Sequence, residues 1–300
     1  MSGPKNIVLI PAWKRPEFLA ACLKYITLSR GWKANHYLIA IDNHSFAGGK
    51  YDPEVLSIAN QFPGEKTIKI RPPDGIRSNT RNLMEGYREA VKLGNEIGSE
   101  LVYMIETDIF IARDFFDFHE AVHRDHRPFF VSACRNQNNK AALSLAQDPT
   151  AIHAFGKYQS LGNSFRVAEL GRVVRHSRPE FYANMPNYIR TAFPGSKFPK
   201  GMWTEQDGLI NRIMEEGKLS GLFPNVPRAY HAGFTGYNRT GRELPRSMSL
   251  TERTAALMTM SESEMNERAS NPQFKDITMC DLLGHDAKAF HIAKPNAVPN

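Results

Sequence analysis

The chain has 300 residues, 41 % of them hydrophobic, which is enough for one large domain or two small ones to bury a core. Its net charge of +7 indicates an anionic partner, without choosing between nucleotide phosphates, nucleic acid and anionic lipid. The three cysteines form no CxxC pair, so neither a zinc site nor a disulfide framework is indicated. With no signal-peptide pattern and no apolar run near the roughly 20 residues of a membrane span, we expect a cytoplasmic protein.

The first predicted unit is a strand, a loop and a helix. A β-branched run from Asn6 to Ile10 predicts the strand, and the sequence PAWKRP ends it. Apolar residues at helical spacing follow from Phe18 to Ile26. Ligands of open α/β sheets bind at the carboxyl ends of strands, so Arg15 in this loop is a candidate for phosphate contacts.

The second predicted strand, Tyr37 to Ile41, ends at Asp42. A carboxylate there can accept hydrogen bonds from a ribose hydroxyl or a base N–H, although an Asp-Asn pair is also common in turns. A third strand is predicted from Thr67 to Ile70. No glycine-rich phosphate loop follows any of these strands.

A helix is predicted to open within the sequence DGIRSNTRN, residues 74–82, and to continue with apolar residues on one face. Arg77 and Arg81 lie near the start of this helix. Anions are favoured at helix N-termini, so both arginines are candidates for contact with a phosphate.

The stretch from Leu101 to Asp108 is the most informative part of the chain. Its apolar run predicts a strand buried on both faces, and it ends in Glu106-Thr107-Asp108. Residues two apart in an extended segment point the same way, so Glu106 and Asp108 are expected to reach one point. A hard divalent cation such as Mg²⁺ or Mn²⁺ would offset their repulsion. An ordinary strand end, with Asp108 capping the next helix, is the structural alternative.

Helices and strands are also predicted in the part of the chain after Asp108. Helices are predicted at 114–123 and 141–155, a strand at 129–133, and a strand pair at 158–167. The aromatic residues of 179–193 are expected in the core. A further helix opens at Glu205-Gln206-Asp207, where carboxylates are also favoured electrostatically. Short strands follow, the last ending at His231, and residues 249–269 are helix-like.

The order of these motifs resembles the GT-A glycosyltransferase fold, whose members use nucleotide-sugar donors. The resemblance covers roughly residues 5 to 240 and implies a Rossmann-like α/β fold, with a mixed, mostly parallel sheet flanked by helices. We expect a catalytic domain at 1–245, with a donor half at about 1–135 and an acceptor half at about 136–245. Residues 246–300 are expected to form a helical C-terminal extension.

The resemblance implies how the donor is held. Pro11, Ala12, Arg15 and Asp42 match positions that hold the nucleoside, and Arg81 matches the arginine of an "ARN" segment in which this chain has Thr80 instead of alanine. Arg77, Glu106 and Thr107 are further donor-binding candidates. The implied donor is a nucleotide sugar of the UDP type.

The resemblance also implies a metal site and a catalytic base. Glu106 and Asp108 match the DxD motif, with glutamate replacing the first aspartate, and His231 matches a late metal ligand. The implied cofactor is Mn²⁺ or Mg²⁺. Asp207 matches the catalytic base of inverting members, in a Glu-Asp motif whose first residue is here Gln206, and Glu205 is the alternative base. The predicted activity is therefore metal-dependent sugar transfer to an acceptor hydroxyl with inversion.

The acceptor and the class of activity stay open at this stage. Basic residues gather in 166–200 and 239–246, in excess of what one diphosphate needs. A saccharide or lipid-linked acceptor is the common case in the family that the chain resembles, whereas a nucleic-acid acceptor, such as a hydroxymethylated base in DNA, would use the positive surface to neutralise phosphates. A nucleotidyltransferase is a second possibility, but it would be expected to carry a glycine-rich loop after the first strand. A non-catalytic nucleotide-sugar-binding module is a third, because Glu106 and Gln206 depart from the family motifs.

Overall fold

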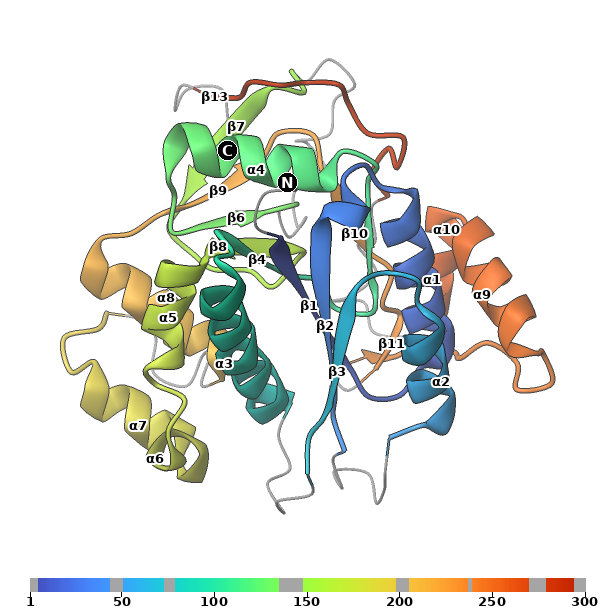
Figure 1. Ribbon diagram of the computed structural model, residues 1–300, viewed down its shortest axis with the longest axis horizontal. Coiled ribbons are helices and arrows are strands. Elements are labelled where there is room, and N and C mark those ends of the chain that lie inside the picture. The colour runs from blue at the N-terminus through green and yellow to red at the C-terminus, as the bar shows by residue number, and fades with distance from the viewer. Residues whose placement is uncertain are drawn as a thin grey trace.

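The computed structural model describes residues 5–43, 51–72, 79–134, 148–197, 205–236, 239–269 and 279–293. Its centre is a nine-stranded sheet (Figure 1). In sheet order the strands are β13 (His291–Ile292), β7 (Ala151–Phe155), β9 (Gly221–Pro224), β6 (Phe130–Ser132), β8 (Asn163–Arg166), β4 (Leu101–Met104), β1 (Asn6–Ala12), β2 (Asn35–Ile41) and β3 (Lys66–Ile70). Five neighbouring pairs run parallel and three run antiparallel, so the sheet is mixed and mostly parallel.

Alternation along the central strands separates two cores. Val8 and Ile10 of β1 face one core, whereas Ile7 and Leu9 face the other, and β2 alternates in the same way. Strands buried on both faces carry continuous apolar runs, which is why β1, β2 and β4 were recognisable in the sequence. The predicted α/β fold class, a mixed, mostly parallel sheet flanked by helices, is confirmed.

Helices cover both faces of the sheet (Figure 1). One face carries α1 (Pro16–Leu28), α2 (Pro53–Gln61) and α9 (Leu250–Thr259). A short 3-10 turn, η1 (Trp32–Ala34), lies between α1 and β2 in the chain. The other face carries α3 (Asn79–Ile97), α5 (Val167–Val174), α6 (Pro179–Ala183), α7 (Met185–Ala192) and α8 (Gln206–Gly217). α4 (Phe115–His126) packs Phe118 and Val122 against Val131 of β6 and Leu222 of β9.

Two short ribbons lie outside the large sheet. β5 (Ile109–Ile111) pairs antiparallel with β10 (Ala229–His231), and β11 (Thr235–Gly236) pairs with β12 (Arg239–Thr240). The ribbon of β5 and β10 joins the end of the central strand β4 to a segment more than 100 residues later. This pairing brings two of the predicted site residues together.

The structure corrects several predicted elements. Residues 151–155, expected in a helix, form strand β7, and the described residues of the predicted strand pair at 158–167 contain only β8. The helix-like stretch 249–269 is split at Met260 into α9 and α10 (Glu262–Arg268). Residues 279–293 then return to the sheet and end in β13 rather than in a helix. In the described part of the chain, no helix is both long and apolar enough to span a membrane.

Candidate functional site

The site forms where the chain turns at the end of β4. The amide of Ile105 still donates to the carbonyl of Leu9 of β1, and the amide of Ile109 then donates to the carbonyl of Glu106 at 2.9 Å, closing a turn over 106–109. Because the backbone turns here, strand alternation does not set the directions of Glu106 and Asp108. Their side chains take different partners.

Asp108 and His231 lie side by side. Antiparallel pairing places Ile109 opposite His231, and the amide of Ala232 donates to the carbonyl of Asp108 at 2.8 Å. The imidazole Nε2 of His231 lies 3.5 Å from Oδ2 of Asp108. The spatial relation on which the sequence interpretation depends, an acidic residue after β4 beside the late histidine, is present.

Gly233 lies against one side of this pair and places no side chain there. A Cβ at this position would lie 2.4 Å from Oδ2 of Asp108 and 2.9 Å from Nε2 of His231, closer than side chains approach such atoms. Glycine therefore allows the backbone to pass directly beside the two functional groups. The sequence His-Ala-Gly contained this signal, which the sequence analysis did not use.

Arg15 reaches the same carboxylate from the other side. Its Nη1 donates to Oδ2 of Asp108 at 2.9 Å and to the carbonyl of Thr235 at 2.6 Å, and its Nη2 donates to Oγ1 of Thr107 at 3.3 Å. The residue precedes α1 in the left-handed backbone region, with φ of 65°. Non-glycine residues rarely adopt this conformation, and it tends to persist where surrounding contacts enforce it.

Opposing effects act on Asp108, which is only 7 % exposed. Burial alone would raise its pKa, but Arg15 and His231 together outweigh burial and hold the pKa well below its ordinary value. The second oxygen, Oδ1, is buried and has no hydrogen-bond partner among the described residues. The group is therefore a carboxylate with one oxygen paired and one available.

Glu106 points to a different neighbour. Its Oε1 accepts a hydrogen bond from Ser160 at 3.1 Å. Burial, and then the negative charges of Asp108 and Asp207, raise the pKa of Glu106 to about 8. In the described residues, no group of three or more His, Cys, Asp or Glu side chains has the geometry to hold a metal ion. Of the three predicted metal ligands, Asp108 and His231 lie together, whereas Glu106 is hydrogen-bonded to Ser160.

Asp207 lies in the first turn of α8, which starts at Gln206, while Glu205 occupies the exposed N-cap position. The side-chain amide of Gln206 donates from Nε2 to Oδ1 of Asp207 at 3.3 Å, and its Oε1 accepts from Oγ1 of Thr80 on α3 at 2.7 Å. Burial, and then the charge of Glu205, raise the pKa of Asp207 to about 7. A carboxyl with this pKa is suited to take up a proton near neutral pH.

A buried network connects the surroundings of Glu106 and Asp207. The hydroxyls of Tyr87 and Tyr158 lie 3.1 Å apart, and the amide of Tyr158 donates to Oδ1 of Asn211 at 2.7 Å. Asn211 in turn donates from Nδ2 to the carbonyl of Asp207 at 2.8 Å. The segment that carries Ser160 is thus tied to the first turns of α8.

Asp42, which was predicted to contact the nucleoside, forms an ion pair with Arg71. Its Oδ1 accepts from Nε of Arg71 at 2.9 Å, and Nη2 of Arg71 lies 2.8 Å from the same oxygen. The amide of Asp42 donates to the carbonyl of Ala12 at 2.7 Å, and Pro11 lies opposite Ala40 in the parallel register. Ala12 and Asp42 therefore lie side by side at the carboxyl ends of β1 and β2, and Arg71, which was not among the predicted site residues, is paired with Asp42.

Of the two arginines predicted near the start of α3, Arg81 lies within the described residues. Arg81 lies over the ring of Tyr182 on α6, with its guanidinium carbon 4.1 Å from the ring centroid, and its Nε lies 3.4 Å from Glu85. The contact with Tyr182 joins α3 to α6. Arg77 falls outside the described residues.

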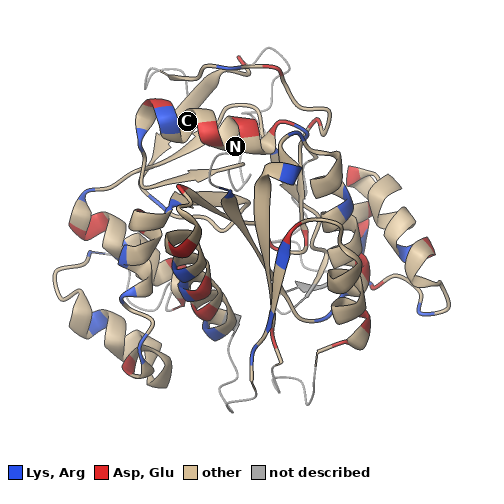
Figure 2. Cartoon of the chain, in the orientation of Figure 1, with Lys and Arg blue, Asp and Glu red and all other residues tan. Residues whose placement is uncertain are grey.

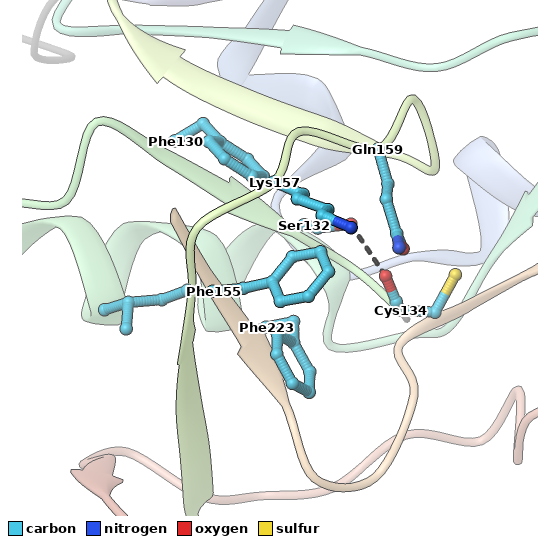
Figure 3. Close-up of a pocket in the computed structure, with 8 residues that line it drawn as sticks. Phe130, Ser132, Cys134, Phe155, Lys157, Gln159 and Phe223 are labelled. Carbon is cyan, nitrogen blue, oxygen red and sulfur yellow. Dashed lines mark hydrogen bonds between the residues drawn. The ribbon is translucent and has the colours of Figure 1, made fainter. Parts of the chain in front are cut away.

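A narrow gap lies between β6, β7 and β9 (Figure 3). Phe155 and Phe223 line it from two strands, and Gln159, the neighbour of Ser160, lines it from the following segment. Across its floor the hydroxyl of Ser132 donates to the carbonyl of Cys134 at 2.8 Å. Its lining contains neither Asp108 nor Asp207.

Comparison with known proteins identifies no family. No family model matches the chain, and no curated protein matches it. Among solved structures, the crystal structure of S. aureus TarS 1-349 is similar, with a TM-score of 0.44 and 11 % sequence identity over 75 % of this chain and 59 % of that one. This chain therefore spans less than two thirds of the TarS chain, and a similarity at this TM-score assigns neither a family nor a function.

Proposed function

We propose that this protein is a glycosyltransferase that moves a sugar from a nucleotide-sugar donor to an acceptor hydroxyl with inversion. The observation that carries the proposal is the convergence of Arg15, Asp108 and His231 at the carboxyl end of β4, with the carboxyl group of Asp207 supplied by a different element. Ligands of open α/β sheets bind at this end of the strands. Arg15, Asp108 and His231 together suit the binding of a diphosphate. The carboxyl group of Asp207 suits the activation of an attacking hydroxyl.

A divalent cation, Mn²⁺ or Mg²⁺, fits the first group. Asp108 offers a buried oxygen without a hydrogen-bond partner in the described chain, and Gly233 leaves space beside Asp108 and His231. Magnesium-type sites commonly combine one or two protein ligands with substrate phosphates and water, so two ligands suffice. When bound, the cation would supply stabilisation of the negative charge that grows on the departing diphosphate.

The chain's own residues account for the rest of the proposed reaction. Arg71 fixes the carboxylate of Asp42, which is then oriented to accept a hydrogen bond from the nucleoside. The carboxylate of Asp207 takes the proton of the acceptor hydroxyl, and Gln206 orients it by donating to Oδ1. The hydroxyl oxygen forms the new glycosidic bond as the bond to the diphosphate breaks.

The test pairs binding with transfer. Nucleotide sugars, UDP sugars first, are screened by thermal shift with and without Mn²⁺, because ligand stabilisation grows with concentration over Kd. Asp207→Asn should keep donor stabilisation and abolish transfer, whereas Glu216→Gln, an exposed change on the same helix, should keep both. Full transfer by Asp207→Asn would remove the residue from the base role. No stabilisation by any nucleotide sugar would overturn the proposal itself.

We take a saccharide hydroxyl as the acceptor. Several of the arginines in the basic segments have partners within the chain: Arg166 donates to the carbonyl of His123, Arg172 pairs with Glu169, and Arg178 donates to the carbonyl of Arg175. Figure 2 shows acidic and basic residues mixed over the flanking helices. Duplex binding that weakens steeply with salt would instead favour a DNA acceptor with a hydroxymethylated base.

A further inference from the structure

The carboxylate proposed to bind a metal already has a counter-ion in this structure. Arg15 donates to Oδ2 of Asp108 at 2.9 Å, and the same oxygen lies 3.5 Å from the imidazole of His231. With Arg15 in place, the single negative charge of Asp108 is balanced. A guanidinium and a divalent cation on one buried carboxylate would leave an excess of positive charge, which a site of low polarity opposes strongly.

Arg15 is held in this position by several contacts at once. Its Nη1 and Nη2 also donate to the carbonyl of Thr235 and to Thr107, and its guanidinium carbon lies 4.9 Å from the centroid of the Phe18 ring. The side chain is nevertheless 27 % exposed, compared with 10 % for that of Asp108. One side of the guanidinium therefore borders solvent, where a bound anion would approach it.

A diphosphate would resolve the excess charge. Its oxygens can accept the hydrogen bonds that Arg15 now gives to Asp108, and arginine suits phosphate because its donors lie in one planar fork. The freed Oδ2 and the available Oδ1 of Asp108 would then both face the cation. Metal and diphosphate would each remove the obstacle to binding of the other, which is a coupling between two ligands.

We propose that Arg15 occupies the cation position on Asp108 in the metal-free protein, so that a divalent cation binds tightly only when a nucleoside diphosphate draws the guanidinium away. This inference rests on the proposed function, because it assumes that Asp108 and His231 are the metal ligands. It also implies an order of binding. The protein alone has low affinity for the metal, and binding of the donor raises that affinity.

The test is a titration with Mn²⁺ in the absence of any nucleotide, followed by electron paramagnetic resonance of the free ion. Wild-type protein should bind Mn²⁺ weakly, and Arg15→Met should bind it about tenfold more tightly or better, because the competing charge is gone. Arg15→Gln, which keeps a polar side chain, should behave like Arg15→Met. Arg15→Lys keeps the charge and should stay close to wild type.

Lys14→Met is the matched control, because it removes the same charge from the neighbouring residue. Lys14 lies over the ring of Trp13, with Nζ 4.7 Å from the centroid, and is not among the contacts of Asp108. It should leave Mn²⁺ affinity nearly unchanged. Equal tightening in Lys14→Met and Arg15→Met would reduce the effect to general electrostatics and overturn the inference.

Measurements of Mn²⁺ binding to the wild-type protein, with and without UDP, test the inference without any variant. Tight Mn²⁺ binding without nucleotide, or Mn²⁺ affinity that is the same with and without UDP, would overturn the inference even if the Arg15 variants fail to fold. Failure of the proposed function looks different: the protein would retain neither UDP nor GDP nor ADP in equilibrium dialysis, with or without Mn²⁺. Retained UDP with unchanged Mn²⁺ affinity in Arg15→Met would reject the inference and leave the function standing.

Discussion

Thr80 and Gln206, 126 residues apart in the chain, meet through a buried hydrogen bond of 2.7 Å between Oγ1 and Oε1. Both residues are departures from the glycosyltransferase motifs that the sequence resembles, Thr80 from an alanine and Gln206 from a glutamate. The structure shows that the two departures are partners. Because the Thr80 hydroxyl occupies Oε1 of Gln206, the amide nitrogen is the end that faces Asp207.

We predict that Thr80→Val lowers the rate of sugar transfer with little effect on donor binding. Valine keeps the shape of threonine but leaves Oε1 of Gln206 buried without a donor, which typically costs about 1–3 kcal/mol and lets the amide rotate. Loss of orientation at Asp207 is expected to lower kcat roughly tenfold, equivalent to about 1.4 kcal/mol of barrier. Steady-state kinetics measures kcat and KM separately.

Thr191→Val is the control for this prediction, because the hydroxyl of Thr191 bonds the carbonyl of Asn187 within α7. The double variant Thr80→Ala with Gln206→Glu restores the family pattern at both positions. If the two residues act as a pair, the double variant should lose less activity than the sum of the single changes. Strict additivity of the two losses would show that the hydrogen bond has no role in orienting Asp207.

The raised pKa of Asp207 predicts how activity and stability depend on pH. A base must be ionised, so kcat/KM in wild-type protein should fall as pH drops through about 7. In the unfolded chain this carboxyl has its ordinary pKa of 3.8, so the folded state binds the proton more tightly than the unfolded state does. The folded state therefore loses stability as pH rises from 3.8 to about 7. Asp207→Asn should therefore be more stable than wild type at pH 8, on the order of 1 kcal/mol, and not at pH 4. Thermal unfolding at both pH values measures this, and equal stability at pH 8 would contradict it.

Gly233→Ala should disable the site without unfolding the protein. The added methyl group would lie 2.4 Å from Oδ2 of Asp108 and must push the carboxylate or His231 aside. We expect loss of metal and donor binding. The melting temperature should stay within a few degrees of wild type, because a local displacement of one side chain costs about 1–2 kcal/mol. Gly195→Ala is the control, since a Cβ there meets no atom within 4 Å. Normal Mn²⁺ and UDP binding by Gly233→Ala would show that the gap beside Asp108 is not needed.

The parts of the site that were visible in the sequence are those that end regular strands. The apolar runs of β1, β2 and β4 predicted the sheet, and parallel strands bring their carboxyl ends to one edge. Asp42 and Asp108 were therefore predicted at strand ends, and His231 was predicted as a metal ligand through the family resemblance. The pairing of β5 with β10, which brings His231 to Asp108, was not predicted, because no strand was predicted between Asp108 and the helix at 114–123.

Residues that act through long-range contacts were missed. Arg71 follows an edge strand and looks like a solvated arginine, yet it is 9 % exposed and paired with Asp42. Ser160 and Thr80 are small polar residues whose partners come from other elements. Local periodicity contains no information about such partners. Strand β7 was mistaken for a helix because a stretch rich in alanine favours helix locally, while its place beside β9 and β13 depends on tertiary pairing.

A second buried cluster lies away from the site, where His119 and His123 of α4 share the hydroxyl of Ser164. Nδ1 of His119 and Nε2 of His123 lie 2.6 and 2.9 Å from its Oγ. Burial, with the neighbouring His123, lowers the pKa of His119 well below its ordinary value, and burial followed by Arg166 lowers that of His123 to about 3. Both side chains are therefore neutral in the folded protein at neutral pH.

This cluster predicts the acid sensitivity of the fold. Below the ordinary histidine value of 6.5 the unfolded chain takes up protons that the folded protein does not, so stability is present above pH 6.5 and is lost as pH falls toward 3. Each buried histidine contributes up to about 1.4 kcal/mol per pH unit in this range. His123→Gln, whose amide nitrogen can replace Nε2 toward Ser164, should reduce the slope of unfolding free energy between pH 6 and 5 by up to that amount. His291→Gln, at a side chain 60 % exposed, should leave the slope unchanged. Urea unfolding at pH 5, 6 and 7 measures the slopes, and an equal slope in His123→Gln and wild type would show that the buried imidazole is not what makes the fold acid-sensitive.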